Sequence, residues 1–127
     1  EDRQMGKALA RLLVDLDLGE AKPFLRAPYG CFLTLFSLAA ERWNISLDDA
    51  ANGFLWMWAE NKVLCAVKLI PLGQTDGQKI LSAVIETIAQ VIDHGLTLGD
   101  EDIGYTAPGH GISSALHETQ YTRLFRS

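Results

Sequence analysis

Two histidines near the end of this 127-residue sequence are the side chains best suited to metal chemistry. His110 and His117 are weak candidates for a metal site, because imidazole is a common ligand of borderline metals. Their spacing of seven residues would align them on one face of a helix. Gly109 and Gly111 disfavour a helix there, so the sequence predicts that His110 lies in a loop.

The remaining chemical candidates do not form a catalytic set. Cys31 and Cys65 match neither a zinc nor a redox spacing, and we expect both to be buried free thiols. The acidic segment 99–104 lacks the later ligands of a calcium loop, and segment 73–79 lacks the glycine-lysine-hydroxyl order of a phosphate loop. No nucleophile stands beside a base. These patterns predict that the chain is not an enzyme and binds no cofactor directly.

Composition places the chain among ordinary globular proteins. It is 48% hydrophobic and 21% charged, and its net charge is -5. The acidic balance, with no basic run, argues against nucleic acid as a partner. No apolar run is long enough to cross a membrane, so we expect a cytoplasmic protein of one domain over residues 1–127. The sequence opens inside a helical pattern without a cap, as expected of the C-terminal portion of a longer domain.

Helical periodicity dominates the first half of the chain. In residues 3–18, an amphipathic helix carries an apolar stripe of residues at spacings of three and four: Met5, Leu9, Leu12 and Leu16. Gly19, Pro23 and Pro28 then predict a loop. A second helix, apolar on most faces and therefore buried, is expected from Pro28 to about Trp43.

Two longer helices follow. Ser46 with Asp49 forms a variant of the capping box and opens a helix to about Ile70 that is apolar on most faces. Thr75 and Gln78 predict a second capping box, for a helix that ends near Gly95. Its seam comprises Ile80, Leu81, Val84, Ile85, Ile88, Val91 and Ile92. Glycine-rich residues 95–111 predict a loop, and residues 112–127 a short terminal helix. We therefore expect an all-α bundle of about five helices without a sheet.

Two segments are unusual for a solvent-facing surface. In AVKLIPLGQ (66–74), Lys68 interrupts an apolar stretch just before the break at Pro71 and Gly73. In SALHETQYTRLFRS (114–127), aromatic and arginine residues are concentrated on a helix too short to persist alone. Such residues are typical of interface anchors.

Both segments resemble the F-type urease accessory proteins. AVKLIPLGQ is similar to the family's stretch of lysine, proline, glycine and glutamine, and SALHETQYTRLFRS is similar to its C-terminal end. The acidic GDEDIG and the opening KALARLL are also similar, so the resemblance covers nearly the whole chain. It implies a non-catalytic chaperone subunit of a GTP-dependent complex that helps to insert nickel into urease.

The resemblance also implies which partners and residues are involved. The partners are a D-type or H-type scaffold, a G-type GTPase that binds the GTP, and the urease apoprotein. Partner-binding residues are assigned to the segment AVKLIPLGQ and to a docking tail, residues 112–127: Lys68, Pro71, Gly73, Gln74, His117, Glu118, Gln120, Tyr121, Arg123, Leu124, Phe125 and Arg126. The apolar helix at 46–70 predicts a homodimer. The alternative is that the chain carries nickel itself through His110 and His117.

Overall fold

The fold is all-α. The computed structural model describes residues 2–27, 29–104 and 107–121, and no strand occurs within these ranges. The α-helices are α1 (Asp2–Asp15), α2 (Phe32–Arg42), α3 (Leu47–Leu69), α4 (Gln74–Gly95) and α5 (Pro108–Glu118). Two short 3-10 helices, η1 (Gly19–Leu25) and η2 (Asp100–Asp102), lie between them. The predicted fold class is confirmed.

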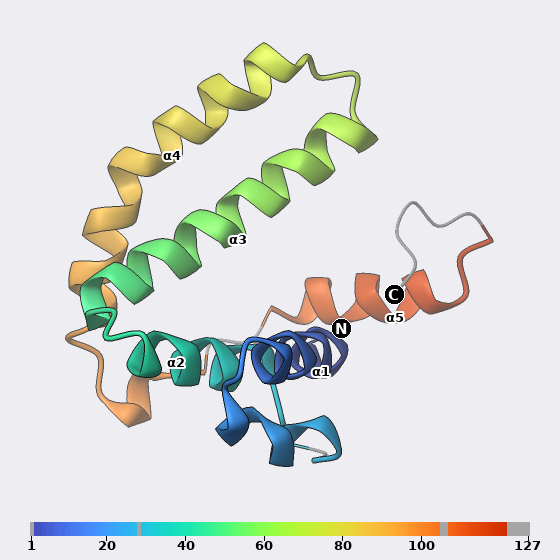
Figure 1. Cartoon of the computed structure of the whole chain (residues 1–127). Helices are drawn as coiled ribbons and strands as arrows, with labels where there is room; N and C mark the ends of the chain where they lie inside the picture. The colour runs from blue at the N-terminus through green and yellow to red at the C-terminus, as the bar shows by residue number, and fades with distance from the viewer. Residues whose placement is uncertain (1, 28, 105–106, 122–127) are drawn as a thin grey trace. The chain divides into compact units, whose positions relative to one another are not determined.

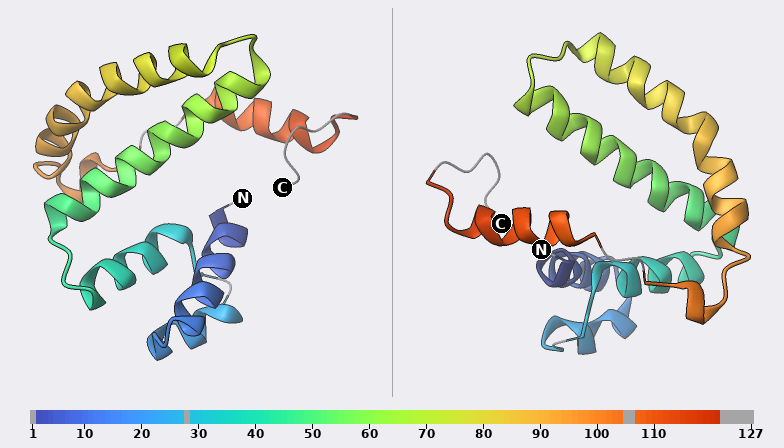
Figure 2. Two further views of the ribbon diagram at one scale, coloured as in Figure 1. Left: turned by 45° about the horizontal axis from the view of Figure 1, so that its top comes forward. Right: turned by 180° about the vertical axis from the view of Figure 1, so that it is seen from behind.

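The chain divides into two compact units, Glu1–Gly95 and Leu96–Ser127. Unit 1 contains α1 to α4, and unit 2 contains η2 and α5. In unit 1, α3 and α4 run side by side as a long antiparallel hairpin (Figure 1). Both further views show the same hairpin (Figure 2). The expectation of one domain over residues 1–127 stays a prediction.

The core of unit 1 lies where α1, η1 and α2 meet. Its buried members are mostly small or aliphatic: Ala10, Leu13, Leu18, Ala21, Leu35 and Ala39. Among the residues that the structure describes, only Leu13 and Leu35 are large side chains that are fully buried. The segment expected to be a loop before Pro28 instead forms η1, because Leu18 and Ala21 contribute to this core.

The buried face of α1 differs from the predicted stripe. Gly6, Ala10 and Leu13 face inward, whereas Leu12 and Leu16 are each more than half exposed. The inward face is the one with Gly6 because the backbone of α1 approaches the backbone at Gly30 closely there. A Cβ on Gly6 would overlap the carbonyl oxygen of Gly30. Amphipathic stripes normally face a core. Most of the predicted apolar stripe is therefore exposed on the surface of unit 1 and does not pack against its core.

Helices α1 and α2 end in the same way. The Leu18 N–H donates to the Leu13 carbonyl at 2.9 Å, and the Ile45 N–H donates to the Ala40 carbonyl at 2.8 Å. Asp17 and Asn44 have φ values of 64° and 54° and occupy the left-handed position of these Schellman motifs. The turns position Leu18 in the core and Ile45 on the surface.

The start of α2 is set by tertiary contacts rather than by proline. We expected the helix to begin at Pro28, but its first residue is Phe32. The Phe32 N–H donates to the Asp2 carboxylate at 3.1 Å, so a side chain of α1 caps α2. Glycine 30 is buried against Phe24 just before this start. The predicted boundary was wrong because the cap comes from 30 residues away.

The hairpin is anchored to α2 at the start of α3. At its start, Ser46 Oγ accepts a hydrogen bond from the Asp49 N–H at 3.1 Å, which confirms the predicted cap of α3. Phe54 of α3 packs against Phe32 and Phe36 of α2 with ring centroids 6.4 and 5.5 Å apart. The second predicted cap is wrong, because α4 begins at Gln74 and Thr75 lies inside its first turn.

Candidate protein-binding surfaces

The hairpin turn brings together the four predicted binding residues of unit 1. Lys68 is in the last turn of α3, Pro71 and Gly73 are in the turn, and Gln74 begins α4. All four are exposed. The Gly73 carbonyl accepts the Gly77 N–H at 3.0 Å, so the turn is tied to the first turn of α4.

Two apolar neighbours extend this surface. Leu69 and Ile70 are 61% and 58% exposed, beside Lys68 and the proline of the turn. Neither residue was predicted from the sequence to bind a partner, although their position next to the turn was a usable signal. A mixed surface of apolar side chains and one cation is typical of protein interfaces.

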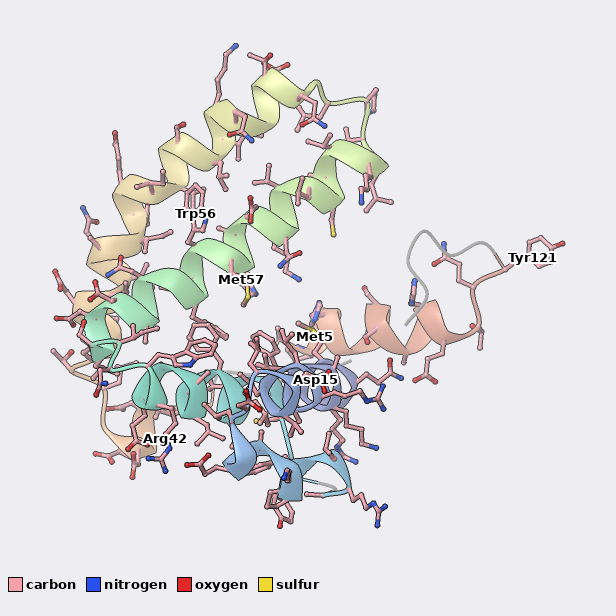
Figure 3. The ribbon with its side chains drawn as sticks, in the orientation of Figure 1. Met5, Asp15, Arg42, Trp56, Met57 and Tyr121 are labelled. Atoms are coloured by element: carbon pink, nitrogen blue, oxygen red, sulfur yellow. The ribbon has the colours of Figure 1, made fainter. Side chains whose placement is uncertain are left out.

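The described part of the docking tail lies at the end of unit 2. His117 is partly buried in the last turn of α5, and Glu118, Gln120 and Tyr121 are exposed. The Gln120 N–H donates to the His117 carbonyl at 3.2 Å. Tyr121 is drawn beyond the end of α5 and is fully exposed (Figure 3). Four predicted binding residues lie outside the described residues: Arg123, Leu124, Phe125 and Arg126.

Helix α5 begins earlier than predicted. Its first residue is Pro108, so His110 lies in a helix and the predicted loop is wrong there. Proline suits this first position because its φ is already helical, and the Gly111 N–H closes the first turn on the Ala107 carbonyl at 3.1 Å. Fixed geometry at the start of the helix outweighs the low helix propensity of Gly109 and Gly111.

The helix places His110 and His117 on one face but two turns apart. Seven residues of α-helix rise about 10.5 Å, whereas an imidazole ligand lies about 2 Å from its metal. Histidines that share an ion on one helix are usually four residues apart. Within the described residues, no three His, Cys, Asp or Glu side chains gather closely enough to hold a metal ion.

Both cysteines are free, but neither is fully buried, so the prediction of buried thiols is wrong. Cys31 lies at the cap of α2, and its Sγ is 3.0 Å from the Thr34 hydroxyl. This hydrogen bond is the main cause that lowers the pKa of the Cys31 thiol. Backbone hydrogen bonds from Thr34 and Leu33 lower the pKa further, whereas the Asp2 carboxylate opposes this shift.

Helix α3 exposes much of its apolar surface, as its apolar faces predict. Ala59 is its only buried residue. Trp56 and Met57 point to opposite sides of the helix, with Trp56 toward α4 (Figure 3). Trp58 is 54% exposed and has the Lys62 ammonium 5.5 Å from its ring centroid. Beside it, Leu55, Ala59, Val84, Ile88 and Val91 line an apolar hollow of about 130 Å³.

These observations define an all-α protein whose prominent surfaces are apolar faces, an exposed hairpin turn and an exposed aromatic residue. No helix in the described ranges is long and apolar enough to cross a membrane. A family model described as UreF matches residues 1–85. The chain therefore belongs to the UreF family, and the family resemblance seen in the sequence is confirmed.

The curated relatives of this chain are urease accessory proteins. It is 52% identical over 127 residues to urease accessory protein UreF of Alkalilimnicola ehrlichii. It is 45% identical to the protein of that name from Hahella chejuensis and 43% identical to urease accessory protein UreF 2 of Brucella anthropi. All of this chain is matched in each case, but it spans only 56%, 57% and 56% of these relatives.

Proposed function

We propose that this chain acts as a non-catalytic subunit of a GTP-dependent chaperone complex that helps to insert nickel into urease in the cytoplasm. Its membership of the UreF family carries the proposal, since the relatives are named urease accessory proteins. In this proposal the G-type partner binds and hydrolyses GTP. The chain itself holds no cofactor and contributes surfaces that bind the scaffold, the GTPase and the urease apoprotein.

The two exposed surfaces support separate binding roles. The turn at Pro71 and Gly73 joins two helices of more than 20 residues that pack against each other. It presents Lys68 together with apolar side chains, a combination suited to a partly acidic partner. Tyr121 is fully exposed in the free chain, so its whole aromatic side chain is available to be buried against a partner. We assign the turn to partner contact and the tail to the D-type or H-type scaffold.

Direct nickel carriage by His110 and His117 remains the alternative proposal. Both residues lie on α5, which favours a common face. Their separation of two turns does not favour a shared ion within one chain. The docking role therefore has the stronger support.

Replacing Tyr121 by Ala should weaken binding to the D-type scaffold without loss of fold. We expect a loss of about 2 kcal/mol, roughly thirty-fold in Kd, as for an aromatic hot spot. The melting temperature should stay unchanged, because Tyr121 is fully exposed. Isothermal titration calorimetry with the purified scaffold measures the affinity.

Tyr29 provides the matched control for this experiment, since it is an exposed tyrosine in unit 1. Tyr29→Ala should leave scaffold affinity intact. If Tyr121→Ala lowered the melting temperature by several degrees while affinity stayed the same, Tyr121 would be a structural residue and the docking role would be wrong.

We also propose that the chain forms a homodimer through the apolar hollow beside Trp58. Burying a half-exposed tryptophan and its aliphatic neighbours gives about 25 cal/mol per Å² of apolar surface. Sedimentation velocity at micromolar concentration should show a dimer, and Trp58→Glu should convert it to a monomer because the substitution removes the aromatic surface and places a charge in an apolar interface. A Glu60→Ala control on the same helix should remain dimeric. A monomer of the unsubstituted chain would refute the proposal.

A further inference from the structure

Asn52 and Gly53 form an asparagine–glycine pair near the start of α3, a sequence that can modify itself. Asparagine is chemically labile. The backbone nitrogen of the glycine attacks the side-chain carbonyl carbon of the asparagine, and the side-chain nitrogen leaves as ammonia with the glycine's amide proton. Water then opens the resulting succinimide ring to give aspartate or isoaspartate. Glycine favours this ring closure because it has no side chain to obstruct it.

The helical conformation holds the pair in an unreactive geometry. In an α-helix, each backbone N–H donates to the carbonyl four residues earlier, so the Gly53 nitrogen is held by the preceding turn. The Asn52 side chain is held in the same way, because its Nδ2 donates to the Asp48 carbonyl at 2.8 Å. The reaction therefore requires this part of the helix to open.

The first turns of α3 have little tertiary packing to keep them closed. No residue in the range 46–53 is buried, and Ala59 is the only buried residue of the helix. The Ser46 cap and the packing of Phe54 on α2 hold this end. Segments with few buried contacts open locally at a much lower free energy than the whole domain. Opening at Asn52 should therefore precede global unfolding.

The second half of α3 is held more firmly. Val63 and Val67 lie against Gly77 of α4, where a glycine Cβ would come within 3.4 and 2.9 Å of their methyl groups. Asn61 is in this half and is an internal reference for Asn52. It is also exposed, and its Nδ2 also donates to the carbonyl four residues earlier, at 3.0 Å. The two asparagines differ in the residue that follows them and in the packing of their turns.

We propose that Asn52 is a site of spontaneous deamidation whose rate is limited by opening of the first turns of α3. The aspartate product keeps a normal backbone and adds a negative charge near the helix N-terminus, where the helix dipole favours it. The isoaspartate product inserts a methylene group into the backbone between the Ser46 cap and Phe54, which interrupts the helical hydrogen bonds there. This proposal concerns the chain itself and does not depend on the proposed role in nickel insertion.

The test measures two deamidation rates in one protein. Lys62→Gly gives Asn61 the same following residue as Asn52, and peptide mapping by mass spectrometry follows both sites in one sample at neutral pH. In concentrated urea the two rates should be about equal, because no helix protects either site. In native buffer both sites should react more slowly, and Asn52 should react roughly ten-fold faster than Asn61 because its turn opens more easily.

Ser46→Ala, made in the otherwise unsubstituted chain, tests the role of helix opening without changing α3 at its centre. Loss of the cap should speed deamidation of Asn52 about five-fold in native buffer and leave the rate in urea unchanged. The isoaspartate fraction, isolated by ion exchange, should melt at a lower temperature than the Asn52→Asp variant, which has the same charge and a normal backbone.

Three results would overturn the proposal. The first is a native rate at Asn52 equal to the rate in urea multiplied by the globally unfolded fraction, because only complete unfolding would then expose the site. The second is equal native rates at Asn52 and Asn61 in a Lys62→Gly protein that is folded by circular dichroism. The third is an unchanged native rate in Ser46→Ala.

Discussion

Replacing Leu35 by Ala should lower the free energy of unfolding by about 3 kcal/mol. Leu35 is completely buried among α1, η1 and α2, and truncating such a side chain costs both its transfer free energy and the cavity that remains. The effect is large because domains of this size are stabilised by only about 5–15 kcal/mol in total. Urea unfolding followed by circular dichroism measures the change.

Leu33 is the matched control for this substitution, two residues away on the same helix. It is 53% exposed, so Leu33→Ala should cost less than about 1 kcal/mol. Equal costs at the two positions would contradict the placement of the core. Because α2 presents only one face to α1, the difference between these leucines also reports the rotation of α2.

Gly6→Ala should also destabilise unit 1, by about 2 kcal/mol or more. The new methyl group would overlap the Gly30 carbonyl oxygen and lie 2.8 Å from the Cys31 carbonyl carbon. Both are backbone atoms that cannot rotate away, so α1 and the segment before α2 must separate. This cost should exceed the gain of about 1 kcal/mol in helix propensity.

The contrasting substitution is Gly53→Ala, which meets no atom within 4 Å in this chain. It should stabilise the chain by up to about 1 kcal/mol through helix propensity. Thermal unfolding of the two variants therefore separates propensity from packing. A stabilising effect of Gly6→Ala would show that the two backbones are not in contact.

Local signals in the sequence specified where most helices lie. The period of 3.6 residues in 47–69 and 74–95 predicted two long helices, and the Ser46 cap and Gly95 fixed two of their four ends. Caps and periodicity act over one or two turns, which is why a single sequence is sufficient for them. The same locality made the exposed turn at Pro71 and Gly73 predictable.

The sequence on its own determined the helical class, the two long helices and the family to which the chain belongs. Tertiary structure decided which faces are buried. In α1 the buried face contains Gly6 and Ala10 rather than Leu12, because two backbones approach closely at Gly6. Helix α2 starts at Phe32 because the Asp2 carboxylate of α1 accepts its N–H. Hydrophobic periodicity shows that a face is apolar, but burial depends on partners distant in the sequence, so only the assembled unit reveals it.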